Sequence, residues 1–307
     1  MAKRPVVVYE ILPPRIVDGT IESYAEKISS LLSQTHIDAI NIPEVRAEGT
    51  RGERPVSESL RAEPREFGRL LQDSVGLETI INRVTVHDPP GQQKDWFVNT
   101  YENFGIENIV IVGGESGDID YLGPGVVEST KMIGEINLHR GSDIFCGGIC
   151  IPSRKIESAR MIKKARSGIE FFTTQVLYDG EDICKMLGHY HRSCVNEGEE
   201  AKRILLSFAP ISTEKNMRFL KWLGIEIPPD TEEYLLEDRN EMKERSMKVS
   251  MRILEEILDY MTENRISVPI GLNIEHIMSH NFDISVELLQ MMAKKYRIFC
   301  MGSSLFE

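Results

Sequence analysis

The chain has 307 residues, of which 41% are hydrophobic, and it carries a formal net charge of −12 at pH 7. This size suits one large α/β domain with a full core. The acidic balance argues against a nucleic-acid or anionic-membrane partner, because both need a concentrated basic face. No apolar run reaches the roughly 18–20 residues that cross a bilayer.

Strand-like apolar runs alternate with helical patterns along the chain. We expect strands at 6–12, 39–44, 78–86, 108–113, 144–151, 171–178, 204–211 and 268–274. The helical patterns cover 20–34, 57–74, 92–104, 126–136, 156–167, 181–196, 213–223 and 243–263, with a further C-terminal helix at 284–295. Residues 228–230 and 237–244 are expected to extend one loop.

About eight strand-plus-helix units match a (β/α)8 TIM barrel, an α/β fold of roughly 250 residues plus additions. We therefore predict one barrel domain over residues 1–307, with an extra C-terminal helix. A doubly wound sheet is the competing architecture. It usually has a glycine fingerprint after the first strand, where this chain has Pro13 and Pro14.

The first strand carries a carboxylate near its end. The run Val6-Val7-Val8-Tyr9 is typical of a buried strand, and Pro13 and Pro14 end it because proline cannot donate to a ladder. Glu10 therefore lies where an acid is costly without a partner or a chemical task. A catalytic role and an ion pair with Arg15 or another cation are both open at this point.

Polar side chains follow most of the expected strands. In a barrel these strand ends meet at one mouth, where the chemistry is assembled. The set is Glu10, Glu44, Thr85 with His87, Glu115, Gln175 with Tyr178, and Asn273 with Glu275. It lacks an evident serine nucleophile with a paired base, so it fits acid–base chemistry on a polar heterocycle better than acyl transfer. The alternative is that part of the set only satisfies loop backbone groups.

Two neighbouring strands carry glycine pairs. Gly113 and Gly114 end one strand just before Glu115, and Gly147 and Gly148 lie in the next strand. Glycine lets a ligand or another backbone approach within contact distance. These pairs indicate room for a flat ligand across the mouth.

An amide interrupts the sixth strand. Gln175 can read the donor and acceptor edge of a heterocycle, or it can bridge neighbouring strands. Lys163 and Lys164 end the preceding helix, where cations either complement the helix dipole or contact a phosphate.

Cysteine and histidine spacings do not predict a metal site. The helical pattern of Cys184, His189, His191 and Cys194 points the two histidines about 200° apart. His276 and His280 have i, i+4 spacing without the glutamate of the zinc-protease motif. Five cysteines without a paired-scaffold spacing, and an N-terminus that enters a strand directly, indicate a reducing cytoplasm.

The order of these motifs resembles that of the methylenetetrahydrofolate reductases over most of the chain. Tyr9-Glu10-Ile11-Leu12-Pro13-Pro14-Arg15 resembles the family's Phe-Glu-Phe-Phe-Pro-Pro. Ile109-Val110-Ile111-Val112-Gly113-Gly114-Glu115 and Thr174-Gln175-Val176-Leu177-Tyr178-Asp179 resemble its next markers. A further similar segment runs from Phe208-Ala209-Pro210-Ile211-Ser212 to Leu223-Gly224-Ile225-Glu226-Ile227-Pro228.

That family folds as a (β/α)8 barrel, usually holds FAD and reduces 5,10-methylenetetrahydrofolate to 5-methyltetrahydrofolate. By resemblance, Glu10 is the general acid that protonates a folate nitrogen as the five-membered ring opens, and the iminium carbon then takes a hydride from the flavin. Glu115 falls where the family has an aspartate beside flavin and pterin, and Gln175 matches a pterin-binding glutamine. We expect Tyr178 and Asn273 to complete the substrate contacts.

The resemblance also implies flavin contacts. Glu157, Arg160 and Lys164 fall on the helix whose family counterparts contact the ribityl and phosphate portion of the cofactor. The whole expected cofactor set is Arg83, Thr85, Gly113, Gly114, Gly147, Gly148, Glu157, Arg160, Lys163 and Lys164, and no metal ligand is expected.

The chain departs from the family mainly among these flavin contacts. Gly113-Gly114-Glu115 replaces the family's Arg-Gly-Asp, and Arg83 stands in place of a histidine. The tyrosine that follows the family's fifth strand has no clear match around Ile149-Cys150, and Gly271-Leu272-Asn273-Ile274-Glu275-His276 replaces the eighth-strand pattern.

We therefore expect a cytoplasmic reductase of a methylene-tetrahydropterin, of folate or methanopterin type, in one-carbon metabolism and methionine biosynthesis. FAD would carry the hydride, with electrons from NAD(P)H or a partner protein, in a homo-oligomer or a subunit of a reductase complex. The alternative is a flavin-free pterin-binding barrel that acts in methyl transfer or within a larger complex. A third possibility is a barrel for an unrelated heterocycle.

Overall fold

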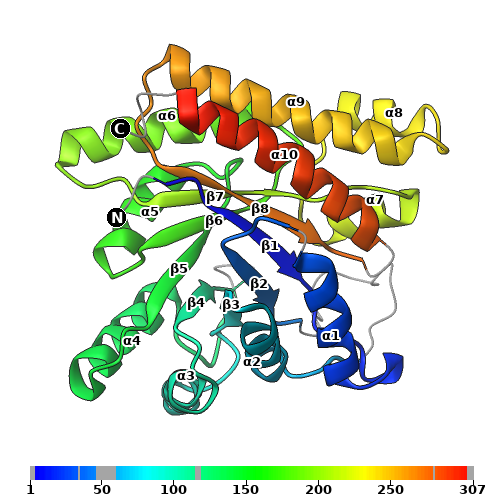
Figure 1. Ribbon diagram of the computed structural model, residues 1–307. Coiled ribbons are helices and arrows are strands. Elements are labelled where there is room, and N and C mark those ends of the chain that lie inside the picture. Colours follow the sequence, from blue (N-terminus) through cyan, green and yellow to red (C-terminus); the bar gives the residue numbers. More distant parts are fainter. Residues whose placement is uncertain (1–3, 34, 46–59, 115–118, 279–280, 303–307) are drawn as a thin grey trace.

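Eight parallel strands close into a barrel in the order β1 to β8 in the computed structural model, which describes residues 4–33, 35–45, 60–114, 119–278 and 281–302 (Figure 1). The strands are β1 (Val7–Ile11), β2 (Ala39–Pro43), β3 (Glu78–Val84), β4 (Asn108–Val112), β5 (Phe145–Cys150), β6 (Phe171–Val176), β7 (Arg203–Phe208) and β8 (Ile270–His276). The predicted (β/α)8 barrel with a C-terminal helix is confirmed.

Helices follow the strands and cover the outside of the barrel (Figure 1). They are α1 (Ile21–Leu32), α2 (Pro64–Val75), α3 (Pro90–Phe104), α4 (Val126–Arg140), α5 (Glu157–Arg166), α6 (Gly180–Glu197), α7 (Glu214–Trp222), α8 (Pro229–Leu236), α9 (Met242–Glu263) and α10 (Phe282–Gly302), with a short 3-10 helix η1 (Ile16–Asp18). Helices α1 and α7 begin at threonine N-caps, because the Thr20 and Thr213 hydroxyls accept hydrogen bonds from the backbone N–H groups of Ser23 and Asn216.

One expected loop is a helix. Residues 228–230 were expected to extend a loop, but Pro228 is the N-cap of α8 and Pro229 its first residue. Proline is tolerated there because the first N–H groups of a helix have no intrahelical partner. The prediction of a continuous loop was therefore wrong.

The eighth strand is shifted relative to the sequence expectation. It was expected at 268–274, and it runs from Ile270 to His276. Glu275 and His276 thus belong to the strand rather than to the loop after it. Because side chains alternate along a strand, Asn273 and Glu275 share one face.

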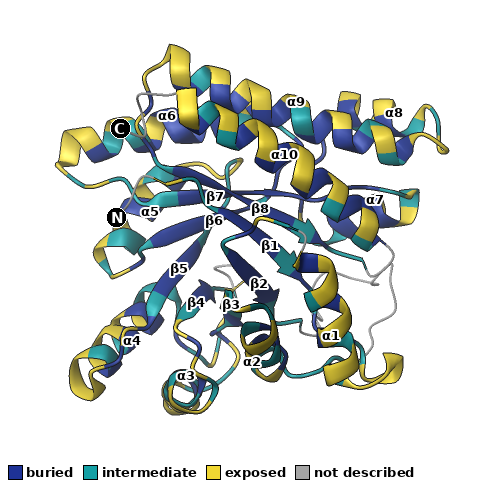
Figure 2. Ribbon diagram, viewed as in Figure 1, coloured by how far each residue is buried: buried dark blue, intermediate teal, exposed yellow. Residues whose placement is uncertain are grey.

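The barrel interior is apolar toward the amino ends of the strands. Val8, Ala39, Ile80, Val110, Phe171 and Leu205 form one buried cluster, separate from the larger core between strands and helices. Figure 2 shows the strands mostly buried, with the helices exposed along their outer sides. Residues two positions further along these strands therefore reach the carboxyl end of the same interior.

The C-terminal helix packs on the first and last strands of the barrel. The Tyr9 hydroxyl on β1 lies 2.6 Å from Ser285 Oγ on α10, and the Tyr296 hydroxyl donates to the carbonyl of Ile270 at 2.7 Å. Helices α9 and α10 lie side by side above the strands in Figure 1. In the described part of the chain, no helix combines the length and the apolarity that a membrane crossing needs.

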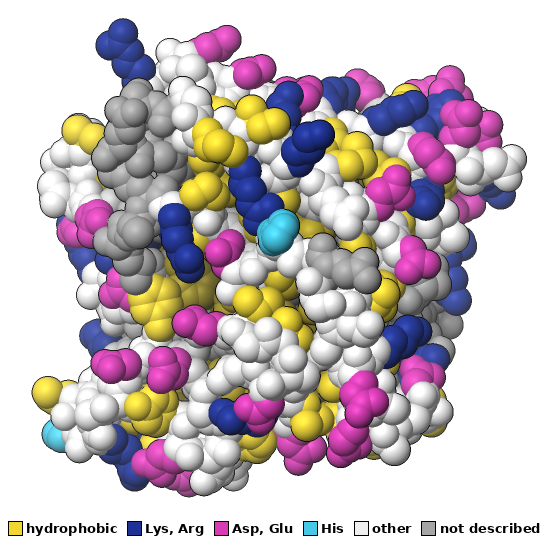
Figure 3. All heavy atoms as spheres, viewed as in Figure 1, with side chains coloured by type: hydrophobic (Ala, Val, Ile, Leu, Met, Phe, Trp, Pro, Cys, Tyr) yellow, Lys and Arg dark blue, Asp and Glu magenta, His cyan; other side chains and the backbone are white. Residues whose placement is uncertain are grey.

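Charged side chains are mixed on the face shown in Figure 3. Lysine and arginine side chains stand among acidic ones and apolar atoms rather than gathering into one basic field. This distribution agrees with the acidic composition of the chain.

Candidate functional site

A ring of polar side chains lies at the carboxyl end of the barrel interior, above the apolar layers. Side chains alternate between the two faces of a strand. The polar residues that follow the interior residues Val8, Ala39, Ile80, Phe171 and Leu205 by two or four positions therefore also point into the interior. The ring consists of Glu10, Asn41, Asn82, Thr173, Gln175, Ser207, Asn273 and Glu275.

Hydrogen bonds across neighbouring strands hold this ring together. Thr173 Oγ1 lies 3.2 Å from Ser207 Oγ, and Asn273 Nδ2 donates to the same Ser207 oxygen at 3.1 Å. Asn273 Nδ2 also donates to Glu275 Oε1 at 3.1 Å. The buried amides and hydroxyls thus fix the side chains that surround the carboxylates.

Glu10 lies in this ring, half-buried. Asn41 Nδ2 donates to Glu10 Oε2 at 2.6 Å. Burial raises the pKa of Glu10 to about 7, although hydrogen bonds from Asn273, Asn41 and Asn82 favour the charged form. A carboxyl with this pKa can hold a proton at neutral pH and release it to a bound group.

The alternative of an ion pair between Glu10 and Arg15 is wrong. Arg15 Nε and Asp18 Oδ2 lie 2.7 Å apart, in η1. The groups that act on the Glu10 carboxyl in the described residues are amides and a second carboxylate. The cost of burying Glu10 is therefore met by protonation and amide donors rather than by a cation.

Glu275 is the second carboxylate of the ring. It pairs in register with Glu10 across the β1–β8 ladder. Burial and the charge of Glu10 hold the pKa of Glu275 well above its usual range, while Ser207 and Asn273 oppose this by hydrogen bonding.

Buried amide oxygens in the ring lack a hydrogen-bond partner among the described residues. They are the Oδ1 atoms of Asn41, Asn82 and Asn273. Buried oxygens of this kind are rare in proteins, because each has lost its water without a replacement donor. A ligand with several N–H donors, or a protonated carboxyl, would satisfy them.

Gln175 lies on the inner face of β6 and is partly exposed. This placement faces the same mouth as Glu10. Glu115, the other residue predicted to be catalytic, lies outside the described residues.

Other residues predicted at the mouth point elsewhere. Tyr178 is buried, and its hydroxyl donates to the carbonyl of Ala209. Thr85 is fully buried, and its hydroxyl donates to the carbonyl of Pro124 at 2.9 Å. Glu44 turns outward from the barrel toward Arg83. These groups serve the packing between strands and loops.

Sequence reasoning missed Asn41, Asn82 and Ser207, and it did not select Glu275 from its list of strand ends. The signal was available, because Asn41 and Asn82 are polar residues inside apolar strands, two positions beyond an interior residue. The sequence prediction selected residues by their position at the end of a strand, whereas the face of the strand decides whether a side chain enters the interior.

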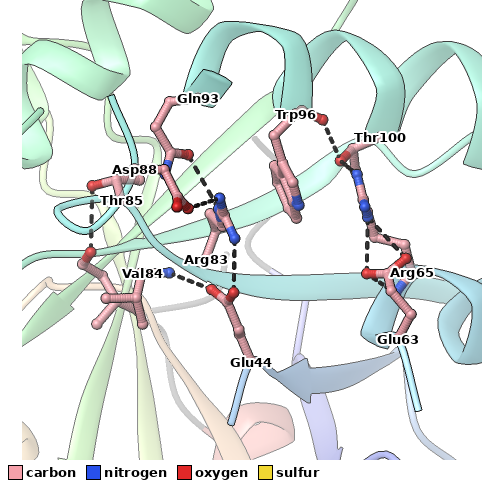
Figure 4. A network of polar contacts seen from close by, with 11 residues as sticks. Glu44, Glu63, Arg65, Arg83, Val84, Thr85, Asp88, Gln93, Trp96 and Thr100 are labelled. Atoms are coloured by element: carbon pink, nitrogen blue, oxygen red, sulfur yellow. Dashed lines mark hydrogen bonds and ion pairs between the residues drawn. The ribbon is translucent and has the colours of Figure 1, made fainter. Parts of the chain in front are cut away.

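Arg83 lies at the centre of a polar network between β3 and α3 (Figure 4). Its guanidinium donates to Glu44 Oε1 at 2.7 Å, to Asp88 Oδ2 at 2.6 Å and to Gln93 Oε1 at 3.1 Å. The Trp96 ring lies between the guanidinium groups of Arg83 and Arg65, at 4.6 and 4.7 Å from its centroid. The network thus uses Arg83 to join the second and third strands to α3.

A cavity of about 450 Å³ borders this network. Its lining includes Glu44, Arg61, Glu63, Arg65, Arg83 and Trp96. The charged groups whose contacts are resolved are engaged with one another, because Arg65 donates to Glu63 at 2.9 Å and Arg83 to Glu44. This cavity lies on the helix side of β2 and β3 rather than in the barrel interior.

One glycine of each pair accommodates an aromatic side chain of the protein. An added Cβ on Gly114 would lie 2.2 Å from the Tyr121 ring, and one on Gly147 would lie 2.4 Å from the Phe171 ring. The Phe171 ring in turn stacks on Phe145 with centroids 5.5 Å apart. Gly113 and Gly148 face Val126 and Ile169. The space that we assigned to a flat ligand at these four glycines is taken by side chains.

The expected phosphate contacts on α5 divide into two groups. Arg160 and Lys163 are exposed. Lys164 Nζ instead donates to the carbonyl of Ile149 at 2.6 Å and lies 3.5 Å from the buried Glu157 carboxylate. Burial lowers the pKa of Lys164, while Glu157 raises it.

These surroundings do not fit a ready flavin cradle at the described positions. The polar atoms of Arg83, Thr85 and Lys164 form hydrogen bonds to other groups of the protein. The four glycines border packed side chains. Of the predicted site residues, the structure brings Glu10, Gln175 and Asn273 together in the carboxylate and amide ring.

One member of the histidine pair considered as a metal motif lies on a strand rather than on a helix. His276 is buried at the end of β8, and its ring makes an edge contact with Phe282. His280 lies outside the described residues. Across the ranges that the structure describes, no group of three or more His, Cys, Asp or Glu side chains could hold a metal ion.

Comparison with known structures supports the barrel architecture. A protein from Clostridium thermocellum described as binding two copies of 5-methyl-5,6,7,8-tetrahydrofolic acid is similar with a TM-score of 0.77 and 23% identity, over 95% of this chain and 96% of that one. A GH113 β-1,4-mannanase is similar with a TM-score of 0.55 and 11% identity, over 99% of this chain and 100% of that one. At these identities the likeness shows the fold alone.

Sequence comparison identifies the family. No curated protein matches the chain significantly. The family model for methylenetetrahydrofolate reductase matches residues 1–268, which is most of the chain. Together with the closed barrel, this match shows that the chain belongs to the methylenetetrahydrofolate reductase family.

Proposed function

We propose that this chain binds a reduced pterin of the tetrahydrofolate class at the barrel mouth and acts as a methylenetetrahydrofolate reductase in which Glu10 is the general acid. The observation that carries the proposal is the position of Glu10. It is a carboxyl with a pKa of about 7, half-buried at the carboxyl end of the interior and surrounded by amides. The folate bound by the C. thermocellum relative supports the ligand class.

In this reaction Glu10 donates its proton to the nitrogen that leaves the methylene bridge. The C–N bond breaks as the nitrogen takes the bonding electron pair, and the bridge carbon remains as an iminium on the other nitrogen. That carbon then accepts a hydride and becomes the 5-methyl group. Because Asn41 Nδ2 bonds one carboxyl oxygen, the acid is held in one orientation toward the mouth.

The amide ring recognises the ligand. The unpartnered Oδ1 atoms of Asn41, Asn82 and Asn273 are acceptors, and the pyrimidine portion of a pterin presents N–H donors. Gln175 on β6 adds both a donor and an acceptor from the opposite side of the interior.

The hydride donor belongs to the flavin or nicotinamide class. FAD is usual in the family, and it remains our first candidate. The engaged side chains of Arg83, Thr85 and Lys164 lead us to propose that a flavin would meet this chain through other contacts than those we expected from the sequence.

These engaged residues also favour a second candidate function. A barrel that keeps the acid and amide ring but lacks a flavin cradle would bind a methyl-pterin and serve in methyl transfer or as a subunit of a larger complex. This candidate predicts pterin affinity without oxidation of 5-methyltetrahydrofolate.

The test begins with the absorbance spectrum of freshly purified protein, followed by calorimetric titration with 5-methyltetrahydrofolate. Oxidation of 5-methyltetrahydrofolate is then followed with added FAD and an electron-accepting dye. We expect binding and turnover, with turnover lost in Glu10→Gln. Binding without turnover would favour the second candidate, and absence of pterin binding would reject both.

A further inference from the structure

Glu10 and Glu275 occupy matching positions on adjacent strands. They are register partners across the parallel β1–β8 ladder, where neighbouring strands lie about 4.8 Å apart. Both side chains point inward, because Val8 on β1 faces the interior two positions before Glu10, and Asn273 reaches the interior Ser207 two positions before Glu275. Both residues are partly exposed, so water and ligands reach them from the mouth.

Among the described residues, the strand side chains that face the two carboxyls are neutral. They are Asn41 on β2, Asn82 on β3, Gln175 on β6, Ser207 on β7 and Asn273 on β8, with apolar Val112 and Ile149 from β4 and β5. The Tyr178 hydroxyl lies near enough to feel the Glu275 charge, but it donates to the carbonyl of Ala209.

Three described cations close to the barrel strands bond to groups other than the two carboxyls. Arg83 pairs with Glu44 and Asp88, and Lys164 lies against Glu157 and the carbonyl of Ile149. Arg203, at the start of β7, donates to the carbonyl of Ile270 at the opposite end of the interior. In the ranges that the structure describes, no cation faces Glu10 and Glu275 from the barrel strands. Two carboxylates placed side by side without a cation do not both ionise at neutral pH.

The unpartnered amide oxygens agree with a protonated carboxyl. Asn41 and Asn273 each turn the Nδ2 donor toward a glutamate and leave Oδ1 buried without a partner. A carboxyl that carries a proton is itself a donor and can satisfy such an oxygen or its neighbouring carboxylate.

We propose that Glu10 and Glu275 form a carboxyl dyad that shares one proton at neutral pH, and that Glu275 is the positioning residue that keeps this proton available to Glu10. The proposal deepens the proposed function and rests on it for the identity of the proton acceptor. When the bound pterin is protonated, the O–H bond of Glu10 breaks, an N–H bond forms, and the dyad is left with two negative charges. A proton from water at the mouth then restores it. Burial and the charge of Glu10 raise the pKa of Glu275 in support of this arrangement.

The dyad is tested on the protein without pterin, so that its failure and that of the proposed function stay separate. Infrared difference spectra between pH 5 and pH 9 follow the protonated-carboxyl band, which ordinary surface carboxyls have lost by about pH 6. We expect the wild type to keep one protonated carboxyl near neutral pH. Glu275→Gln should lower the Glu10 midpoint by about one pH unit or more, because it removes the neighbouring like charge.

Matched variants make the result specific. Glu275→Asp keeps the charge and should keep the midpoint, and Glu10→Gln should lower the midpoint of Glu275 in the same way. Glu78→Gln changes an exposed glutamate at the amino end of β3, opposite the mouth, and should leave the band unchanged. Glu275→Asp and Glu10→Gln also provide the test if Glu275→Gln does not fold.

The proposal is overturned if the wild type shows no carboxyl that titrates above pH 6, or if Glu275→Gln and Glu10→Gln leave the remaining midpoint where it was. A second readout is the pH profile of pterin turnover, which should shift with the infrared midpoint in Glu275→Gln. A shifted midpoint in a protein that does not bind 5-methyltetrahydrofolate would keep the dyad and reject the proposed function.

Discussion

Asn41 on β2 donates a 2.6 Å hydrogen bond to Glu10 on β1, and these two residues are also register partners in the ladder. Glu10 is thus flanked by an amide on one side and by Glu275 on the other, both at its own level of the barrel. The amide orients the acid, while the carboxylate favours its protonated form. A buried acid that is oriented and kept protonated is what proton donation to a bound heterocycle needs.

Glu10→Gln should abolish most turnover and preserve binding. We expect kcat for pterin oxidation to fall by about 10²- to 10⁴-fold, the usual contribution of a general acid, with Kd for 5-methyltetrahydrofolate changed only a few-fold because glutamine keeps the shape and one acceptor. Steady-state kinetics and calorimetry measure the two quantities. Glu78→Gln is the control, and a Glu10→Gln variant with normal kcat would remove Glu10 from the mechanism.

The contribution of Glu10 to the free energy of unfolding should fall as the pH rises from about 5 to 8. Its folded pKa of about 7 lies above the ordinary 4.5, so the folded protein binds more protons than the unfolded chain between these values. The contribution to the free energy of unfolding is therefore largest at low pH and is lost as Glu10 ionises, by an amount on the order of 1–3 kcal/mol. Urea unfolding of the wild type and of Glu10→Gln at pH 5, 6, 7 and 8 isolates this contribution. Equal pH dependences in the two proteins would contradict it.

Gly147→Ala should destabilise the barrel. The new Cβ would meet the Phe171 ring at 2.4 Å, and that ring is itself stacked on Phe145. Overpacking of this kind costs about 1–3 kcal/mol. Gly134→Ala on α4 is the matched control, because its Cβ meets open space and alanine favours the helix by about 1 kcal/mol. Thermal unfolding compares the two variants, and a Gly147→Ala protein as stable as the wild type would show that the ring can move aside.

Arg83→Met should be far more destabilising than the loss of a surface pair. The variant leaves the Glu44 and Asp88 carboxylates without the buried guanidinium that lies 2.7 and 2.6 Å from them. Breaking a buried pair costs about 3–5 kcal/mol. Arg140→Met removes an exposed pair with Glu102 and should cost about 1 kcal/mol or less. Urea unfolding measures the loss of unfolding free energy in both variants. Similar losses in the two would mean that the Arg83 network adds little to stability.

The sequence was sufficient for the barrel, the approximate strands and the prominence of Glu10. Branched apolar runs at regular spacing specify buried parallel strands, and a lone acid before two prolines marks a strand end whatever the rest of the fold does. The Pro228-Pro229 segment shows the limit of such local signals, because the same dipeptide fits a loop or the first turn of α8.

Only the tertiary structure decided which polar residues share the interior with Glu10. Glu10 lies within its strand, whereas Glu44, Thr85 and Tyr178 come just after theirs. These three turn toward helices and loops, where Arg83, Pro124 and Ala209 supply their hydrogen-bond partners. Asn41, Asn82 and Glu275 enter the interior because barrel closure brings β1 between β2 and β8, at a register that no single segment encodes. Which side of a strand faces inward depends on pairing with distant strands, and it was this pairing that placed a second carboxylate beside the first.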